Sequence, residues 1–128
     1  MVEVRVSARC YATEDPQKIV AAIKALFPEA RVEGKDPIRA DSPSVDRFGE
    51  LLRQERIRDA ARAVMRKGIS GNATHFKLNK QVATVGKVSF SQESHPLGDF
   101  EVTISDADIE ALIDRIAPST RRTGGGRS

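Results

Sequence analysis

The sequence contains no tryptophan, one tyrosine, one cysteine and two histidines among its 128 residues. The single cysteine, Cys10, excludes an intramolecular disulfide and a metal site built from several thiolates, and it fits the reducing conditions of the cytosol. No stretch approaches the roughly 20 apolar residues that a membrane helix needs, and the first residues, MVEVRV, lack the apolar run of a signal peptide. We therefore expect a cytoplasmic protein that does not enter a membrane.

Motifs that carry catalysis are also missing from the sequence. There is no P-loop, no GxGxxG and no HExxH, and the glycines at 124–126 do not lie between a strand and a helix. His75 is predicted to be an exposed strand residue and His95 a turn residue, with nothing to bring them together. The acidic residues at 106–114 fit the first turns of a helix, where the helix dipole favours carboxylates. We expect no enzyme activity, no metal site and no cofactor.

Positive charge is concentrated in the middle of the chain. The net charge is +3, but residues 51–90 carry nine basic and two acidic side chains, whereas residues 91–120 carry one basic and seven acidic ones. Such an asymmetry concerns partners rather than fold. The basic segment is a binding surface if it stays exposed, and part of a salt-bridge lattice if the acidic segment folds against it.

The length of the chain favours one domain, which we place at residues 1–120. Residues 121–128 are rich in arginine and glycine and have nothing apolar to bury, which predicts a disordered tail.

The first 43 residues predict a strand, a helix and short strands. Residues 2–11 alternate between apolar and polar side chains, as a half-buried strand does. The Asp-Pro pair at residues 15–16 is typical of a helix start, and Pro28 ends the helix. Residues 31–33 and 37–40 predict short edge strands.

A long helix is predicted from an N-cap at Ser44 to Gly68. At 100° per residue most of its apolar side chains cluster on one side. Phe48 and Leu52 fall on the opposite side, which indicates that a loop or a second copy of the chain covers them.

Residues 73–90 predict a β-hairpin. Paired residues of a hairpin share a face of the sheet. A three-residue loop at 79–81 places Leu78 beside Val82 and keeps the apolar set together, whereas a two-residue turn would place Lys77 opposite Val82.

The end of the domain predicts one more strand and one more helix. Phe100, Val102 and Ile104 alternate with polar residues, and an apolar stripe at helical spacing covers residues 109–116, with Ser105 as the N-cap. The element order is therefore β-α-(short β)-α-β-β-β-α. It predicts an α+β fold: a two-layer sandwich of a mostly antiparallel sheet with helices on one face.

The basic segment supplies candidate contacts to structured RNA. Guanidinium and ammonium groups bind phosphates, and polar side chains of the predicted loop add hydrogen bonds. The outer sheet face carries one aromatic residue, Tyr11, so we expect contacts to backbone and shape rather than base stacking. The candidate RNA-binding residues are Arg53, Arg56, Arg62, Lys77, Asn79, Lys80, Gln81 and Lys87.

Four segments resemble uncharacterised protein family 0201 of archaea. They read YATEDP at residues 11–16, LLRQERIRDAAR at 51–62, LNKQVATVGKVSF at 78–90 and APST at 117–120. The resemblance spans residues 2–120. It implies an archaeal cytoplasmic protein with a fold similar to that of the ribosomal protein that binds five-S ribosomal RNA. It also implies grouping with proteins that are labelled as RNA-binding, and it carries over no catalytic residue. From the basic segment our leading hypothesis is a non-enzymatic RNA-binding protein that acts with ribosomal RNA or in RNA processing.

Two other functions remain open from the sequence. The misplaced Phe48 and Leu52 favour a protein–protein module that forms a homodimer. An enzyme of unrecognised type would require a polar cleft that holds Gln54, Asn79, Lys80 or a histidine.

Overall fold

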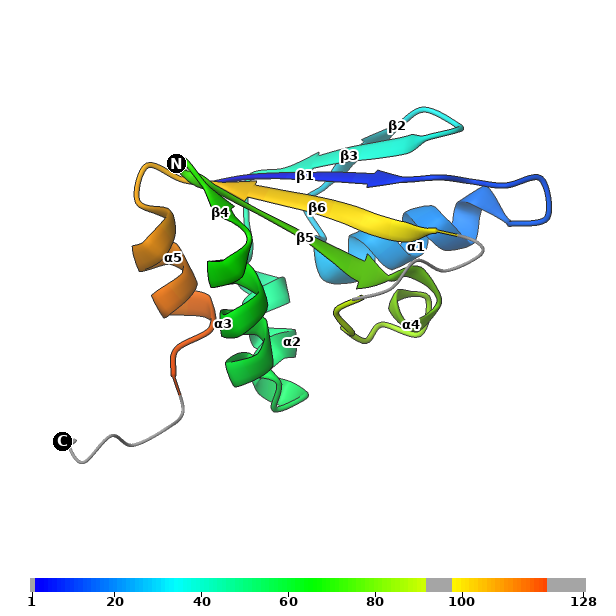
Figure 1. The fold of residues 1–128 in the computed structure, drawn as a ribbon. Helices are drawn as coiled ribbons and strands as arrows, with labels where there is room; N and C mark the ends of the chain where they lie inside the picture. The colour runs from blue at the N-terminus through cyan, green and yellow to red at the C-terminus, as the bar shows by residue number, and fades with distance from the viewer. Residues whose placement is uncertain (1, 92–97, 120–128) are drawn as a thin grey trace, which may run out of the picture.

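The computed structural model describes residues 2–91 and 98–119. Within these residues, antiparallel strands form one sheet in the order β2-β3-β1-β6-β5-β4 (Figure 1). The strands are β1 (Glu3–Ala8), β2 (Arg31–Glu33), β3 (Ile38–Ser42), β4 (Ile69–Ser70), β5 (Ala73–Asn79) and β6 (Asp99–Ser105). The predicted turn at His95 and the predicted tail at 121–128 lie outside the described residues.

The helices of the described residues all lie against one face of this sheet, and they leave the other face open (Figure 1). They are α1 (Pro16–Leu26), α2 (Asp46–Gln54), α3 (Arg58–Lys67), α4 (Lys80–Ala83) and α5 (Ile109–Ile116). The predicted two-layer α+β sandwich is therefore confirmed. No helix of the described residues is long and apolar enough to cross a membrane.

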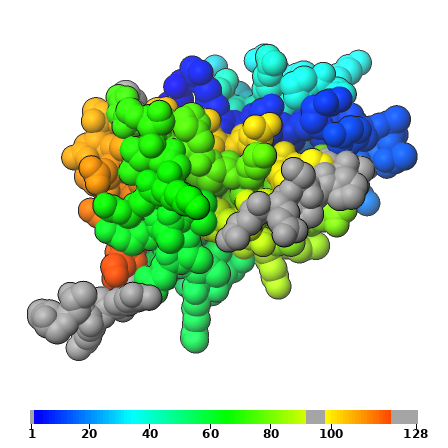
Figure 2. Space-filling model, in the orientation of Figure 1, coloured from blue at the N-terminus to red at the C-terminus, as the bar shows by residue number. Residues whose placement is uncertain are grey.

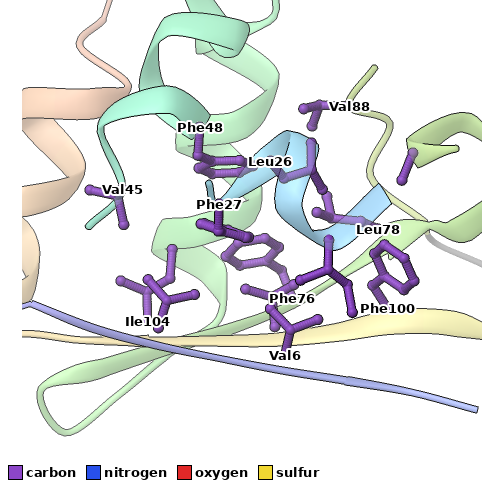
Figure 3. Packing of buried hydrophobic residues seen from close by; sticks show 14 of the residues in the cluster. Val6, Leu26, Phe27, Val45, Phe48, Phe76, Leu78, Val88, Phe100 and Ile104 are labelled. Carbon is purple, nitrogen blue, oxygen red and sulfur yellow. The ribbon is translucent and has the colours of Figure 1, made fainter. Parts of the chain in front are cut away.

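Alternation along the central strands decides which side chains enter the core. The register pairs Val4 with Ile104 and Val6 with Val102, so the apolar residues of β1 and β6 share the helix-covered face. Phe27 and Phe48 from the helix layer stack at 5.4 Å between ring centroids, and Phe48 stacks on Phe76 of β5 at 5.9 Å (Figure 3). Burying each such side chain contributes about 1.5–3 kcal/mol to stability, so these stacked rings stabilise the packing of the helices on the sheet.

The beginning of the chain folds as its local sequence predicts. Asp15 caps α1 and accepts a hydrogen bond from the amide of Gln17 at 2.9 Å. The helix ends at Leu26, two residues before Pro28. Both short strands exist, but β3 lies between β2 and β1, so of these two strands β2 is at an edge of the sheet and β3 is not.

The predicted long helix is wrong, because it divides into α2 and α3. The chain turns at Arg56, whose φ of 58° is left-handed and cannot continue a helix. The turn rotates the apolar side of α2 toward the core. Phe48 and Leu52 are therefore both fully buried inside the domain, and they no longer argue for a second copy of the chain. The N-cap of α2 is Val45, one residue after the predicted Ser44.

The predicted hairpin at residues 73–90 is also wrong. Its first strand is β5, but β5 pairs with β4 on one side and with β6 on the other, over a register with β6 that runs from Ala73–Ser105 to Asn79–Asp99. The predicted loop is instead the start of the short helix α4. Beyond it the chain returns to the sheet at one bridge, between Leu78 and Phe90. Val88 is 5% exposed and packs into the core without joining a strand.

The last strand and helix are confirmed as β6 and α5. The cap differs from the prediction, because Asp108, not Ser105, accepts a hydrogen bond from the amide of Ala111, at 3.1 Å. Gly68 ends α3 where the backbone of β5 passes close by. A Cβ at this position would lie 2.2 Å from the carbonyl oxygen of His75, so the junction of α3 and the sheet requires glycine.

Candidate nucleic-acid interface

The turn between α2 and α3 is fastened to the segment that follows α4. Both carboxylate oxygens of Glu55 accept a hydrogen bond from the amide of Val88, each at 3.1 Å. The next residue after Glu55 is Arg56, and the residue before Val88 is Lys87. This contact therefore brings two basic residues that are far apart in the sequence to the same part of the surface.

We call the group Arg53, Arg56, Arg58 and Lys87 the elbow surface. Arg58 is half-buried and the other three are exposed. Within the described part of the chain, none of the four makes a hydrogen bond or ion pair through its side chain. In Figure 2 the green α2–α3 segment and the yellow-green segment after α4 both reach the side of the molecule away from the sheet. The elbow surface thus offers uncompensated donors on one side of the helix layer.

Lys80 is not part of any surface, contrary to the prediction. It is 2% exposed, and its Nζ donates to the carbonyl oxygen of Arg9 at 2.8 Å and to Oε1 of Glu14 at 3.0 Å. The ammonium also lies 5.5 Å from the centroid of the Tyr11 ring. An ammonium held in this way ties α4 to the loop between β1 and α1, and it is not available to phosphate.

The other two polar residues of the predicted loop differ in their roles. Asn79 is half-buried and caps α4, because its Oδ1 accepts a hydrogen bond from the amide of Val82 at 3.0 Å. Gln81 is exposed on α4. Of the two, Gln81 alone keeps a side chain that a ligand can reach without disturbing a helix cap.

Helix α5, which belongs to the acidic segment, packs against α3 and neutralises part of the basic segment. Arg62 donates to the carboxylate of Asp114 and to the carbonyl oxygen of Ala117. Arg66 pairs with Glu110 at 3.5 Å. Arg62 is therefore no longer a candidate RNA contact. The basic segment forms salt bridges where it lies along α5, and it is exposed to solvent at the elbow surface.

Lys77 lies on the open face of the sheet, in the opposite layer from the elbow surface. The register places it beside Glu101. The charged residues in the strands of that face are Arg5, Arg31, Arg39 and Lys77 on the basic side and Glu3, Glu33, Asp41, Asp99 and Glu101 on the acidic side. Four basic and five acidic side chains give no net attraction for a polyanion, so the sheet face is a weaker candidate than the elbow surface.

A cleft of about 290 Å³ lies between α2 and α5, next to the elbow surface. Its lining residues are Asp46, Gly49, Glu50, Arg53, Arg58, Arg115, Ile116 and Pro118. Two larger hollows, of about 730 Å³ and 480 Å³, lie along the sheet, and each is lined by more carboxylates than basic groups. Of these three, the α2–α5 cleft is the one whose charge suits an anion.

A separate charged group joins the loop after β1 to the loop before β3. Arg9 Nε donates to Oδ1 of Asp36 at 2.7 Å, and the amide of Cys10 donates to the same oxygen at 3.2 Å. These hydrogen bonds, with that of Arg9 foremost, lower the pKa of Asp36. The same contact raises the pKa of Arg9. The polar atoms of this group are hydrogen-bonded to one another, which indicates a structural role.

The histidine that the structure describes forms no metal centre. Nδ1 of His75 lies 2.9 Å from Oγ1 of Thr103 on the neighbouring strand. Among residues 2–91 and 98–119, no cluster of three or more histidine, cysteine or acidic side chains could hold a metal ion.

The sequence did not indicate the importance of Arg58, Arg115 and Glu50. Arg58 was visible as one of several arginines, but its place beside the α2–α5 cleft depends on the turn at Arg56. Arg115 lies in the acidic segment, whose net negative charge does not point to a basic contact. The signal that could have located the turn is the short stretch of sequence between the apolar residues of α2 and those of α3.

Comparison with known proteins gives one consistent result. A family model described as RNA binding matches residues 3–109. A UPF0201 protein of Methanothermobacter thermautotrophicus is 40% identical, over 92% of this chain and 92% of the relative. A UPF0200/UPF0201 protein of Archaeoglobus fulgidus is 36% identical over 94% of this chain, which spans only 38% of that relative. A crystal structure of a UPF0201 protein from Methanococcus jannaschii matches with a TM-score of 0.85 and 40% identity, over 93% of this chain and 95% of that one.

Proposed function

The chain belongs to the UPF0201 protein family of archaea, and from this membership and the elbow surface we propose that it is an RNA-binding protein. The observation that carries the proposal is the cluster of unpaired basic residues that the Glu55–Val88 contact assembles. The match of residues 3–109 to a family model described as RNA binding supports the same function. The contacts that we propose come from Arg53, Arg56 and Lys87, with Arg58 added and Gln81 at the margin.

The proposed binding uses phosphate contacts rather than base stacking. Phe27, Phe48 and Phe76 are in the core, and the ring of Tyr11 is occupied by the cations of Arg9 and Lys80. The described surface therefore offers few aromatic platforms on which bases could stack. Phosphate contacts fix position and register but carry little sequence information. We accordingly propose recognition of structured RNA by shape and charge.

We also propose that the protein acts without catalysis. The polar residues that would have marked a reactive cleft, Lys80 and Asn79, instead serve a buried ion pair and a helix cap. Gln54 ends α2 beside the elbow surface, where a role in RNA contact is sufficient to account for it.

Fluorescence anisotropy with a labelled RNA hairpin, measured at several salt concentrations, tests the proposal. The wild-type affinity should fall steeply with salt, because each neutralised phosphate contributes about 0.7–0.9 to the slope of log affinity against log salt. The triple variant Arg53→Ala/Arg56→Ala/Lys87→Ala should bind more weakly and lose about two to three units of that slope.

A matched control removes the same charge from the other layer. The variant Arg5→Ala/Arg39→Ala/Lys77→Ala takes three basic groups from the open sheet face. It should retain most of the wild-type slope. Equal losses in both triple variants would place the contacts elsewhere, and a wild-type affinity that is absent or indifferent to salt would remove the function itself.

A further inference from the structure

The α2–α5 cleft combines two kinds of polar group that a simple phosphate site would not combine. Arg53, Arg58 and Arg115 supply guanidinium donors, whereas Asp46 and Glu50 supply carboxylate acceptors. An ionised carboxylate repels a phosphate and accepts hydrogen bonds only. The pair of carboxylates is therefore unexplained if the cleft serves phosphate alone.

The pairing inside the cleft leaves one acceptor and two donors unused. Arg115 Nη1 lies 3.5 Å from Oδ1 of Asp46, which joins α5 to α2 across the cleft. Arg53, Arg58 and Glu50 have no hydrogen bond or ion pair through their side chains to any residue that the structure describes. A ligand that uses all three must therefore accept hydrogen bonds at one end and donate one at the other.

A ribose–phosphate unit of RNA has this combination of groups. Its phosphate oxygens accept hydrogen bonds from arginine forks, and its 2′-hydroxyl can donate one to a carboxylate. DNA has the phosphate but lacks this donor, and the 2′-hydroxyl is the group by which a protein distinguishes the two polymers.

We propose that the α2–α5 cleft binds one ribose–phosphate unit of RNA and gives the protein a preference for RNA over DNA. Arg53 and Arg58 hold the phosphate, and Glu50 accepts the hydrogen bond of the 2′-hydroxyl. Arg115, held by Asp46, closes the side toward α5. This inference rests on the proposed RNA-binding function and adds the chemical feature that the site recognises.

The size and the floor of the cleft fit one such unit. Its volume of about 290 Å³ lies at the lower limit of small-ligand sites, which span roughly 300–1,000 Å³. Gly49 allows α2 and α5 to approach, because a Cβ at this position would already lie 3.3 Å from Cβ of Ile116. Ile116 and Pro118 line the cleft beside the charged groups, where the apolar face of a sugar can pack.

The test compares one hairpin sequence made as RNA, as DNA and as 2′-O-methyl RNA, which keeps an oxygen at the 2′ position but has no hydrogen to donate. Wild-type protein should bind the RNA about tenfold more tightly than either analogue, as expected for a hydrogen bond to a charged group. Glu50→Ala should bring the three affinities to within about twofold of one another. Arg58→Ala should weaken binding to all three and leave their ratio unchanged.

A matched control accounts for the change of charge. Removing any carboxylate raises affinity for all polyanions, so the ratio of RNA to DNA affinity is the quantity to measure. Glu29→Ala removes an exposed carboxylate that lines a different hollow and should keep the wild-type ratio. Urea denaturation verifies that each variant is folded, and Glu50→Leu, which has no hydrogen-bond acceptor in its side chain, replaces Glu50→Ala if the alanine variant is not.

The results separate this inference from the function on which it rests. A ratio that collapses in the Glu50 variant and survives in Glu29→Ala supports the ribose site. Wild-type protein that binds RNA and DNA equally, or a Glu50 variant that keeps the preference, overturns the ribose site and leaves RNA binding intact. Wild-type protein that binds no RNA overturns both.

Discussion

The carboxylate of Glu55 accepts the amide hydrogen of Val88 with both oxygens at 3.1 Å, across 33 residues of sequence. The contact joins two of the segments that resemble the family, residues 51–62 and 78–90. A second contact, between Lys80 and Glu14 at 3.0 Å, joins residues 78–90 to residues 11–16. The recognisable segments are therefore in contact with one another, and their polar residues hold the helix layer in the arrangement that exposes the elbow surface.

Replacing Glu55 by alanine should weaken both the fold and the binding of RNA. The amide of Val88 would lose its acceptor in a partly buried position, which costs about 1–3 kcal/mol of unfolding free energy. Lys87 would no longer be held beside Arg56, so RNA affinity should fall although no basic residue is removed. Urea denaturation and anisotropy measure the two effects. Glu50→Ala, within the helix that Glu55 follows, is a control for stability alone and should change the unfolding free energy by less than about 0.5 kcal/mol.

Lys80 and Lys87 should respond in opposite ways to the same substitution. Lys80→Met leaves the carboxylate of Glu14 without its buried partner, which should cost about 3 kcal/mol of unfolding free energy. Lys87→Met changes an exposed side chain, so stability should remain within about 0.5 kcal/mol of wild type while RNA affinity falls. Similar, small losses of stability in both variants would show that the contact between Lys80 and Glu14 does not hold α4.

The parts of the fold that the sequence predicts well are those decided by near neighbours. The alternation that leads to β1 and the cap at Asp15 depend on residues within a few positions of one another. The partner of β5 depends on a strand some twenty residues later, and nothing local distinguishes it from a hairpin partner. Val88 and Phe90 pack on the core, so their apolar pattern resembles a strand, although only Phe90 pairs with β5, at a single bridge.

The candidate site was less predictable than the fold, for a related reason. Arg53, Arg56 and Lys87 were all identified as basic, but their proximity is produced by the contact of Glu55 with Val88. Lysine is almost never fully buried unless it is paired. The acceptors of Lys80 come from the first fifteen residues, and no local pattern around position 80 indicates them.

The contact of Asp36 with Arg9 should make part of the stability depend on pH. The pKa of Asp36 is lower in the folded protein than its ordinary value of 3.8. The carboxylate therefore stabilises the fold above that value, and the contribution is lost as pH falls through the lowered pKa. Asp36→Asn should be less stable than wild type at pH 7, and the difference should vanish toward pH of about 2. Urea denaturation from pH 7 to pH 2 measures this, and Arg9→Gln should remove most of the same pH dependence.

Arg56 should show a conflict between stability and binding. Its φ of 58° costs an ordinary residue about 1–2 kcal/mol relative to glycine, yet the chain has arginine at this position, at the tip of the elbow surface. Arg56→Gly should therefore raise the unfolding free energy by up to about 1 kcal/mol, after the larger entropy of the unfolded glycine chain is subtracted. The same variant should bind RNA more weakly, because the guanidinium is gone. Arg56→Ala should lose as much affinity without any gain in stability, since alanine keeps the backbone strain. If Arg56→Gly is more stable and binds RNA as tightly as wild type, the arginine is not a contact residue, and the strain at this turn serves only to rotate α2 onto the core.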